Sequence, residues 1–196
     1  MNSCALFTDV SLNPQRKLGV GGYLLVPASF LENEPYGIGQ DDVSARLKIK
    51  GFAETSSTTL EVQTVLWALE QVSEGLIDPT GGELEIYTDS QCVAGLLGRR
   101  AALEQNDFIA KRSGRLLSNA ALYRAFYAAH DRMGFRVNKV SGHAPACSHN
   151  TIHRIFSHVD QGVRRALGLW LDSPALPGPS APRHGEYEEA HHGNDR

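Results

Sequence analysis

The segment ELEIYTDSQCVAGLL, residues 83–97, decides the fold. A Pro-Thr-Gly-Gly turn at 79–82 precedes it, and the pattern of Glu83–Thr88 predicts a strand. A short helix is predicted over Ser90–Leu97, so Asp89 lies at the junction between the two elements. One aspartate after a strand usually indicates only a turn. Its significance therefore depends on whether other carboxylates in the chain reach the same place.

Along the chain, three predicted strands come before the first long helix, and the two later strands alternate with helices. Residues 28–45 and 141–150 are predicted loops, and residues 98–114 are polar, basic and only weakly periodic. We expect an α/β fold with a five-stranded mixed sheet, three antiparallel strands followed by parallel strands, flanked by helices. The predicted strands are Cys4–Thr8, Gly19–Pro27, Arg46–Glu54, Glu83–Thr88 and Phe135–Val140, and the longer predicted helices are Thr59–Gly75, Leu116–His130 and Thr151–Leu171.

Length and composition indicate one soluble domain with a tail. A chain of 196 residues can bury a sizeable core, which we place in residues 1–171, and the Pro-rich, polar residues 172–196 are predicted to be disordered. No apolar run approaches the ~18 residues of a membrane span, and no export signal is visible. The three cysteines, Cys4, Cys92 and Cys147, are too few and too odd for a disulfide framework. We therefore expect a cytoplasmic monomer without a membrane partner.

The charge is distributed unevenly along the chain. Residues 1–98 carry a net charge of −8, residues 99–171 carry +8, and residues 172–196 carry −3. A carboxylate cluster that binds metal ions, next to a surface that binds a polyanion, would produce this asymmetry. Two solvated faces of opposite charge are the simpler alternative.

Carboxylates occur at the ends of predicted elements that converge in such a sheet. Asp9 follows the first strand, Glu61 opens the first long helix, Asp89 follows the fourth strand, and Asp160 lies in the last helix. Carboxylates packed together repel one another, unless a divalent cation such as Mg²⁺ or Mn²⁺ neutralises them. Two such ions ~3.5–4 Å apart can activate a water and stabilise the leaving oxygen of a phosphodiester.

Each acid also has a simpler interpretation. Asp9 can start a turn, and Asp89 can cap the helix that begins at Ser90. Glu61 completes a capping-box pattern with Thr58, and Asp160 can pair with Arg164 one helical turn later. These interpretations do not explain why all four acids fall where elements converge.

Five segments in this order resemble the type 1 ribonuclease H family. FTDVSLNP…GVGGYLLV is similar to the first hairpin of that family, and TTLEVQTVLWALE to its helix with a catalytic glutamate. IYTDSQCVAGLL resembles the segment with the third acid, VNKVSGHA the strand before a histidine loop, and HVDQGVRRAL the last helix. The similarity covers about residues 3–168 and implies a ribonuclease H-like fold.

The resemblance implies cleavage of the RNA strand of an RNA–DNA hybrid with two Mg²⁺ ions, or Mn²⁺ in their place. Asp9, Glu61, Asp89 and Asp160 would be the metal ligands, and His143 would be a mobile residue that assists water activation or product release. A shorter alignment would put His153 or Arg154 in the position of the fourth acid; we prefer Asp160 because the residues after it resemble the family's helix.

The basic stretch at 98–115 occupies the position of a protrusion that grips the hybrid in some members of that family. Lysine and arginine side chains there would contact phosphates, although a solvated basic loop is an equal alternative. The predicted substrate-binding residues are Ser11, Asn13, Thr58, Thr59, Gln91, Arg99, Arg100, Lys111 and Arg112.

Other functions stay open at this point. His143, Cys147, His149 and His153 have side chains that can bind zinc, although their spacing is not that of a usual finger. Val10 stands where the family usually has a glycine after the first acid. A module that binds hybrids without cutting them, and a related enzyme that cuts DNA or acts as an exonuclease, are therefore alternatives to the endoribonuclease.

Overall fold

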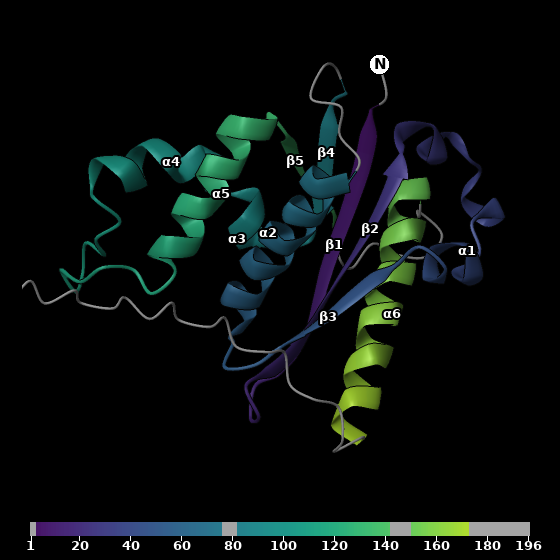
Figure 1. Ribbon diagram of the computed structural model, residues 1–196, viewed down its shortest axis with the longest axis horizontal. Helices are drawn as coiled ribbons and strands as arrows, with labels where there is room; N and C mark the ends of the chain where they lie inside the picture. Colours follow the sequence, from purple (N-terminus) through teal and green to yellow (C-terminus); the bar gives the residue numbers. More distant parts are fainter. Residues whose placement is uncertain (1–2, 76–81, 142–149, 173–196) are drawn as a thin grey trace, which may run out of the picture.

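The computed structural model describes residues 3–75, 82–141 and 150–172 (Figure 1). The predictions of a disordered tail and of a role for His143 concern residues outside these ranges, as do those for Cys147 and His149.

Five strands form one mixed sheet in the order β3-β2-β1-β4-β5. The first three strands are antiparallel neighbours, and β4 and β5 are added in parallel on the other side of β1. The predicted fold class and sheet are therefore confirmed. The strands are β1 (Cys4–Asn13), β2 (Leu18–Pro27), β3 (Lys48–Phe52), β4 (Leu84–Thr88) and β5 (Arg136–Lys139).

Helices cover both faces of the sheet, as Figure 1 shows. One face packs on the helices between β3 and β5, through an apolar core that includes Leu6, Ile86 and Phe126. The other face packs on the last helix and the short helices before β3, through a core that includes Phe7 and Val159. The first group is α2 (Ser57–Gly75), α3 (Gln91–Ala94), α4 (Leu96–Gln105) and α5 (Ala120–Met133), and the second is η1 (Ala28–Glu32), η2 (Pro35–Gly37), α1 (Gln40–Ser44) and α6 (Thr151–Asp172).

Two glycines of β2 allow these helices to approach the sheet closely. A Cβ atom at Gly21 would collide with Thr64 of α2, and one at Gly22 would collide with Val163 of α6. Because successive residues of a strand face opposite sides, the missing Cβ atoms of the two glycines leave room for a helix on each face of the sheet. This brings α2 and α6, which carry two of the predicted site acids, close to the central strands.

The structure corrects three details of the predicted elements. The first strand does not end before Asp9: β1 continues to Asn13 because this half pairs with β2 down to Leu18. Residues 28–45 are not a plain loop, since three short helices form there and bury Ile38 and Val43. The weakly periodic stretch after residue 97 begins as helix α4, which is predominantly exposed and therefore shows little apolar periodicity.

Candidate active site

Asp9 and Asp89 occupy equivalent positions on the two central parallel strands. The register pairs Phe7 of β1 with Tyr87 of β4; two residues further on, Asp9 lies within β1 and Asp89 directly follows the end of β4. Because side chains alternate across a strand, Asp9 lies on the same face as Phe7, which is the face covered by α6. β4 ends at Thr88 while β1 continues, so both aspartates lie where the parallel pairing stops.

Asp160 reaches this place from α6. Its side chain is hydrogen-bonded to that of Asp9, which is only 7% exposed. Burial, together with the charges of Asp89 and Asp160, raises the pKa of Asp9 to about 8, although the backbone N–H of Val10, which donates to Asp9 Oδ1 at 2.8 Å, opposes the shift. Two ionised carboxylates can only accept hydrogen bonds, so the Asp9–Asp160 bond needs a proton.

Glu61 lies just after the first turn of α2 and is held by two serines. Ser90 Oγ donates to Glu61 Oε2 at 2.5 Å, and Ser57 Oγ donates to Oε1 at 3.3 Å. Glu61 also lines a small cavity together with Asp9 and Asp89. The sequence did not indicate Ser57 or Ser90 as partners of Glu61, although Ser90 directly follows the aspartate of the strand-to-helix junction.

The capping alternatives for Glu61 and Asp89 do not hold. Helix α2 begins one residue before Thr58, and Ser56 accepts from the N–H of Thr59 at 3.4 Å in the capping position. At the start of α3 the cap is Ser90, whose Oγ accepts from the N–H of Val93 at 3.1 Å. Neither acid is therefore needed to satisfy a helix terminus. The expected pairing of Asp160 with Arg164 does form, with Arg164 Nε donating to Asp160 Oδ1 at 2.6 Å, in addition to the bond with Asp9.

The donor set has the chemistry of a divalent-cation site. Within residues 3–75, 82–141 and 150–172, no three His, Cys, Asp or Glu side chains are grouped closely enough to hold a metal ion as they stand. The carboxylates nevertheless fit hard cations such as Mg²⁺, which prefer oxygen ligands. Burial, followed by the charges of Asp89 and Asp160, raises the pKa of Asp9, so its ionised form is unfavourable without a cation.

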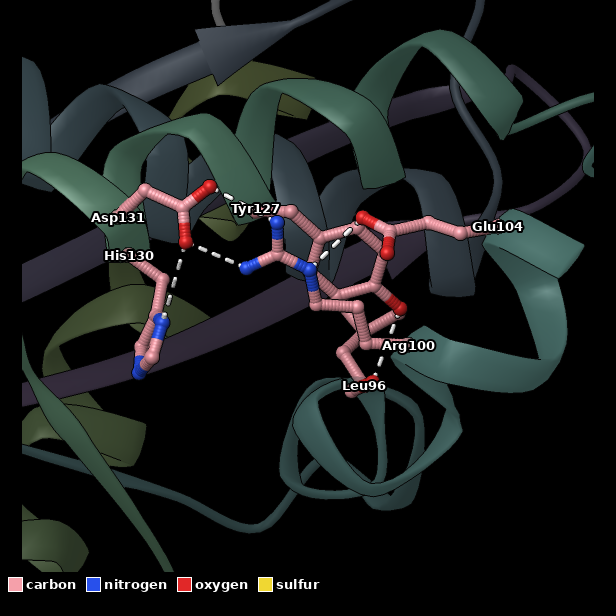
Figure 2. Close-up of polar contacts among 6 residues, drawn as sticks. All are labelled: Leu96, Arg100, Glu104, Tyr127, His130 and Asp131. Atoms are coloured by element: carbon pink, nitrogen blue, oxygen red, sulfur yellow. Dashed lines mark hydrogen bonds and ion pairs between the residues drawn. The ribbon is translucent and has the colours of Figure 1, made fainter.

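Arg100, one of the predicted substrate contacts, is held between two acids (Figure 2). Its two terminal nitrogens donate to the carboxylate of Asp131 at 2.5 and 2.8 Å, and Nε donates to Glu104 at 2.7 Å. The guanidinium also lies over the ring of Tyr127, whose hydroxyl donates to the carbonyl of Leu96. These contacts fasten α4 to α5, and they favour a structural role for Arg100 over a contact with phosphate.

The other predicted cations differ in whether their side chains are already hydrogen-bonded within the protein. Arg99 of α4 folds back onto carbonyls at the end of α3, with bonds of 3.0 Å to Cys92 and 3.2 Å to Gly95. Lys111 and Arg112 are exposed on the turn after α4. A bridge between Ile109 and Leu116 closes that turn, and the buried Phe108, under the guanidinium of Arg124, fixes it to the domain.

The remaining predicted substrate contacts lie at the borders of the acid cluster. Ser11 and Asn13 are on the extension of β1, and Asn13 accepts from the N–H of Arg16 in the following turn. Thr58 and Thr59 are in the first turn of α2, and Gln91, the first residue of α3, accepts from Lys139. The backbone N–H of His153 donates to Asn150 Oδ1 at 3.0 Å at the start of α6, two helical turns before Asp160. It is thus Asp160, and not His153, that the structure brings to Asp9.

The chain belongs to the RNase H family, whose model matches residues 1–155. Asp160 lies beyond the matched span. The foamy viral protease-reverse transcriptase in complex with dsDNA shares the fold, with a TM-score of 0.54 and 12% identity over 81% of this chain and 94% of the other. The same viral protein in complex with an RNA/DNA hybrid gives a TM-score of 0.56 and 10% identity. That match covers 84% of this chain and 20% of the viral chain.

The comparison with curated proteins finds no significant match. In the part of the chain that the structure describes, no helix is long and apolar enough to cross a membrane.

Proposed function

We propose that this protein is a metal-dependent endoribonuclease that hydrolyses the RNA strand of RNA–DNA hybrids. The observation that carries the proposal is the burial of Asp9 beside the charges of Asp89 and Asp160, in a chain of the RNase H family. An uncompensated carboxylate cluster costs stability, and a binding site for cations explains why a fold would keep one. A solved structure with the same fold holds an RNA/DNA hybrid, which supports the choice of substrate class.

Four acids would hold the metal ions: Asp9, Glu61, Asp89 and Asp160. Two Mg²⁺ or Mn²⁺ ions bound there would activate the attacking water and stabilise the leaving oxygen of the phosphodiester. Ser57 and Ser90 fix the two oxygens of Glu61, so this carboxylate is oriented before substrate arrives. His143, which lies outside the described residues, stays our candidate for moving protons in the loop before α6.

The exposed cations on the turn after α4 would hold the phosphate backbone of the hybrid. Lys111 and Arg112 are the strongest candidates because their side chains are exposed on an anchored turn. Contacts of this kind position a duplex without reading its sequence. Recognition would therefore depend on the shape of the duplex and on its 2′-hydroxyl groups.

The decisive experiment is cleavage of an end-labelled RNA–DNA hybrid, run beside double-stranded RNA and double-stranded DNA. We expect Mg²⁺-dependent internal cuts in the RNA strand of the hybrid, which EDTA abolishes. Asp9→Asn and Asp89→Asn should lose the activity because each removes a metal-binding carboxylate. The matched control is Asp41→Asn, which makes the same change at an exposed position on α1 and should cut like the wild type.

Two other results would replace the proposal with an alternative. Salt-sensitive binding of the hybrid with no turnover at any Mg²⁺ or Mn²⁺ concentration would make the protein a binding module. Cleavage of DNA, or release of single nucleotides from an end, would indicate a different nuclease on the same fold.

A further inference from the structure

Arg164 places a permanent positive charge at the edge of the acid cluster. It lies one helical turn after Asp160 on α6, and its Nε donates to Asp160 Oδ1 at 2.6 Å. The side chain of Arg164 is 71% exposed, whereas that of Asp160 is 31% exposed. Asp160 therefore links the solvent-exposed Arg164 to the buried Asp9.

Asp160 consequently contacts two partners, the carboxyl group of Asp9 and the positively charged guanidinium of Arg164. On one side its carboxylate is hydrogen-bonded to Asp9, and on the other it accepts from Arg164. Asp160 would be one of the carboxylates that hold a divalent cation. Such a cation would compete with the guanidinium for the oxygens of Asp160, because both are cations that seek the same lone pairs.

An exposed pair of this spacing on a helix is ordinarily of little consequence. Arg164 differs from such a pair because its charge acts on the whole cluster. The hydrogen bond and charge of Asp160, followed by the charges of Asp9 and Asp89, raise the pKa of the Arg164 guanidinium above its usual value. Arg165, the next residue, is also exposed, and the described residues offer it no hydrogen bond or ion pair.

We propose that Arg164 is a built-in counter-ion of the acid cluster, which holds Asp160 in the metal-free protein and competes with divalent cations for it. The inference rests on the proposed function, because it assigns Asp160 to the metal site. Arg164 then acts as a positioning residue that weakens metal binding and keeps the empty cluster tolerable. Removing its charge should tighten the binding of a divalent ion by roughly 3- to 10-fold, since a like charge near the ion disappears.

The test is calorimetric titration of the full chain with Mn²⁺, without nucleic acid, after treatment with EDTA and its removal. We expect Arg164→Ala and Arg164→Gln to bind Mn²⁺ roughly 3- to 10-fold more tightly than the wild type. Arg164→Lys keeps the charge and should stay near the wild-type affinity. Arg165→Ala is the matched control, and it should change the affinity by less than about 2-fold because its charge is not held at the cluster. Thermal unfolding in EDTA verifies that each variant is folded.

The outcomes separate this inference from the proposed function. Unchanged or weaker Mn²⁺ binding in Arg164→Ala, with a wild type that binds Mn²⁺ and cleaves hybrid, overturns the counter-ion role alone. If Arg164→Ala weakens only the binding of hybrid, the residue is a phosphate contact and the inference is again overturned. A wild type that neither binds Mn²⁺ nor cleaves would overturn both. Should Arg164→Ala be unfolded, Arg164→Gln and Arg164→Lys still decide the question, because they differ from each other in charge.

Discussion

Phe7 and Tyr87 stack on neighbouring parallel strands, with ring centroids 4.9 Å apart and ring planes 15° apart. Both are buried, and each is followed two residues later by an aspartate of the candidate site. The stack therefore fixes the register in which Asp9 and Asp89 meet.

Removing one ring of the stack should destabilise the whole domain. Phe7 is fully buried, so Phe7→Ala should lower the free energy of unfolding by about 3–5 kcal/mol. Tyr87→Phe keeps the ring and loses only the hydroxyl bond to Glu85, so it should cost about 1 kcal/mol or less. Urea unfolding followed by circular dichroism measures both, and equal costs for the two variants would contradict a role of the stack itself.

Asp9 should make the metal-free protein less stable as the pH rises. Its pKa is about 8 in the folded state and 3.8 in the unfolded reference, so between these values the folded chain keeps a proton that the unfolded chain has lost. The free energy of unfolding therefore falls as the pH rises from about 4 to about 8 and levels off above. Asp9→Asn removes this dependence and should be more stable than the wild type by several kcal/mol at about pH 8, with a difference that shrinks towards zero below about pH 4.

The measurement for Asp9 is urea unfolding of both proteins in EDTA across this pH range. Asp41→Asn serves as the control, because this exposed aspartate should leave the pH dependence of the wild type intact. A difference between wild type and Asp9→Asn that does not change with pH would show that Asp9 is ionised throughout.

The sequence predicted the features that depend on local pattern, and missed those that depend on partners far along the chain. Strand alternation and the position of Asp89 after a strand were enough to predict the mixed sheet and the meeting of two acids. Which residue caps a helix could not be predicted, because a shift of two residues in the helix start, from Thr59 to Ser57, moves that role from Thr58 to Ser56. The partner of Arg100 is 31 residues away, and a basic stretch does not reveal which of its cations are already paired.

The contact between Arg100 and Asp131 should contribute to stability and not to catalysis. Arg100→Ala removes the fork that fastens α4 to α5, so the melting temperature should fall by a few degrees. Arg100→Lys should recover little of this loss because an ammonium group cannot make the paired contact. Thermal unfolding provides the measurement, and a double-mutant cycle with Asp131→Ala should show that the two losses are not additive. Additive losses would mean that the pair in Figure 2 makes no net contribution.

The exposed cations on the turn after α4 should contribute to hybrid binding and not to stability, in contrast to Arg100. Lys111→Ala and Arg112→Ala remove charges that are free to meet phosphates, so each should weaken hybrid binding and lower the salt dependence. For each lost contact, the slope of log K against log salt should decrease by about 0.7–0.9. Stability should change by less than about 0.5 kcal/mol, because neither side chain packs against the core.

Arg136→Ala is the matched control, since it removes the same charge from β5, where Glu83 and Glu85 pair with it at 2.6 and 2.8 Å. Fluorescence anisotropy with a labelled hybrid at several salt concentrations measures these slopes, and equal slopes for Arg112→Ala and Arg136→Ala would place the hybrid elsewhere on the surface.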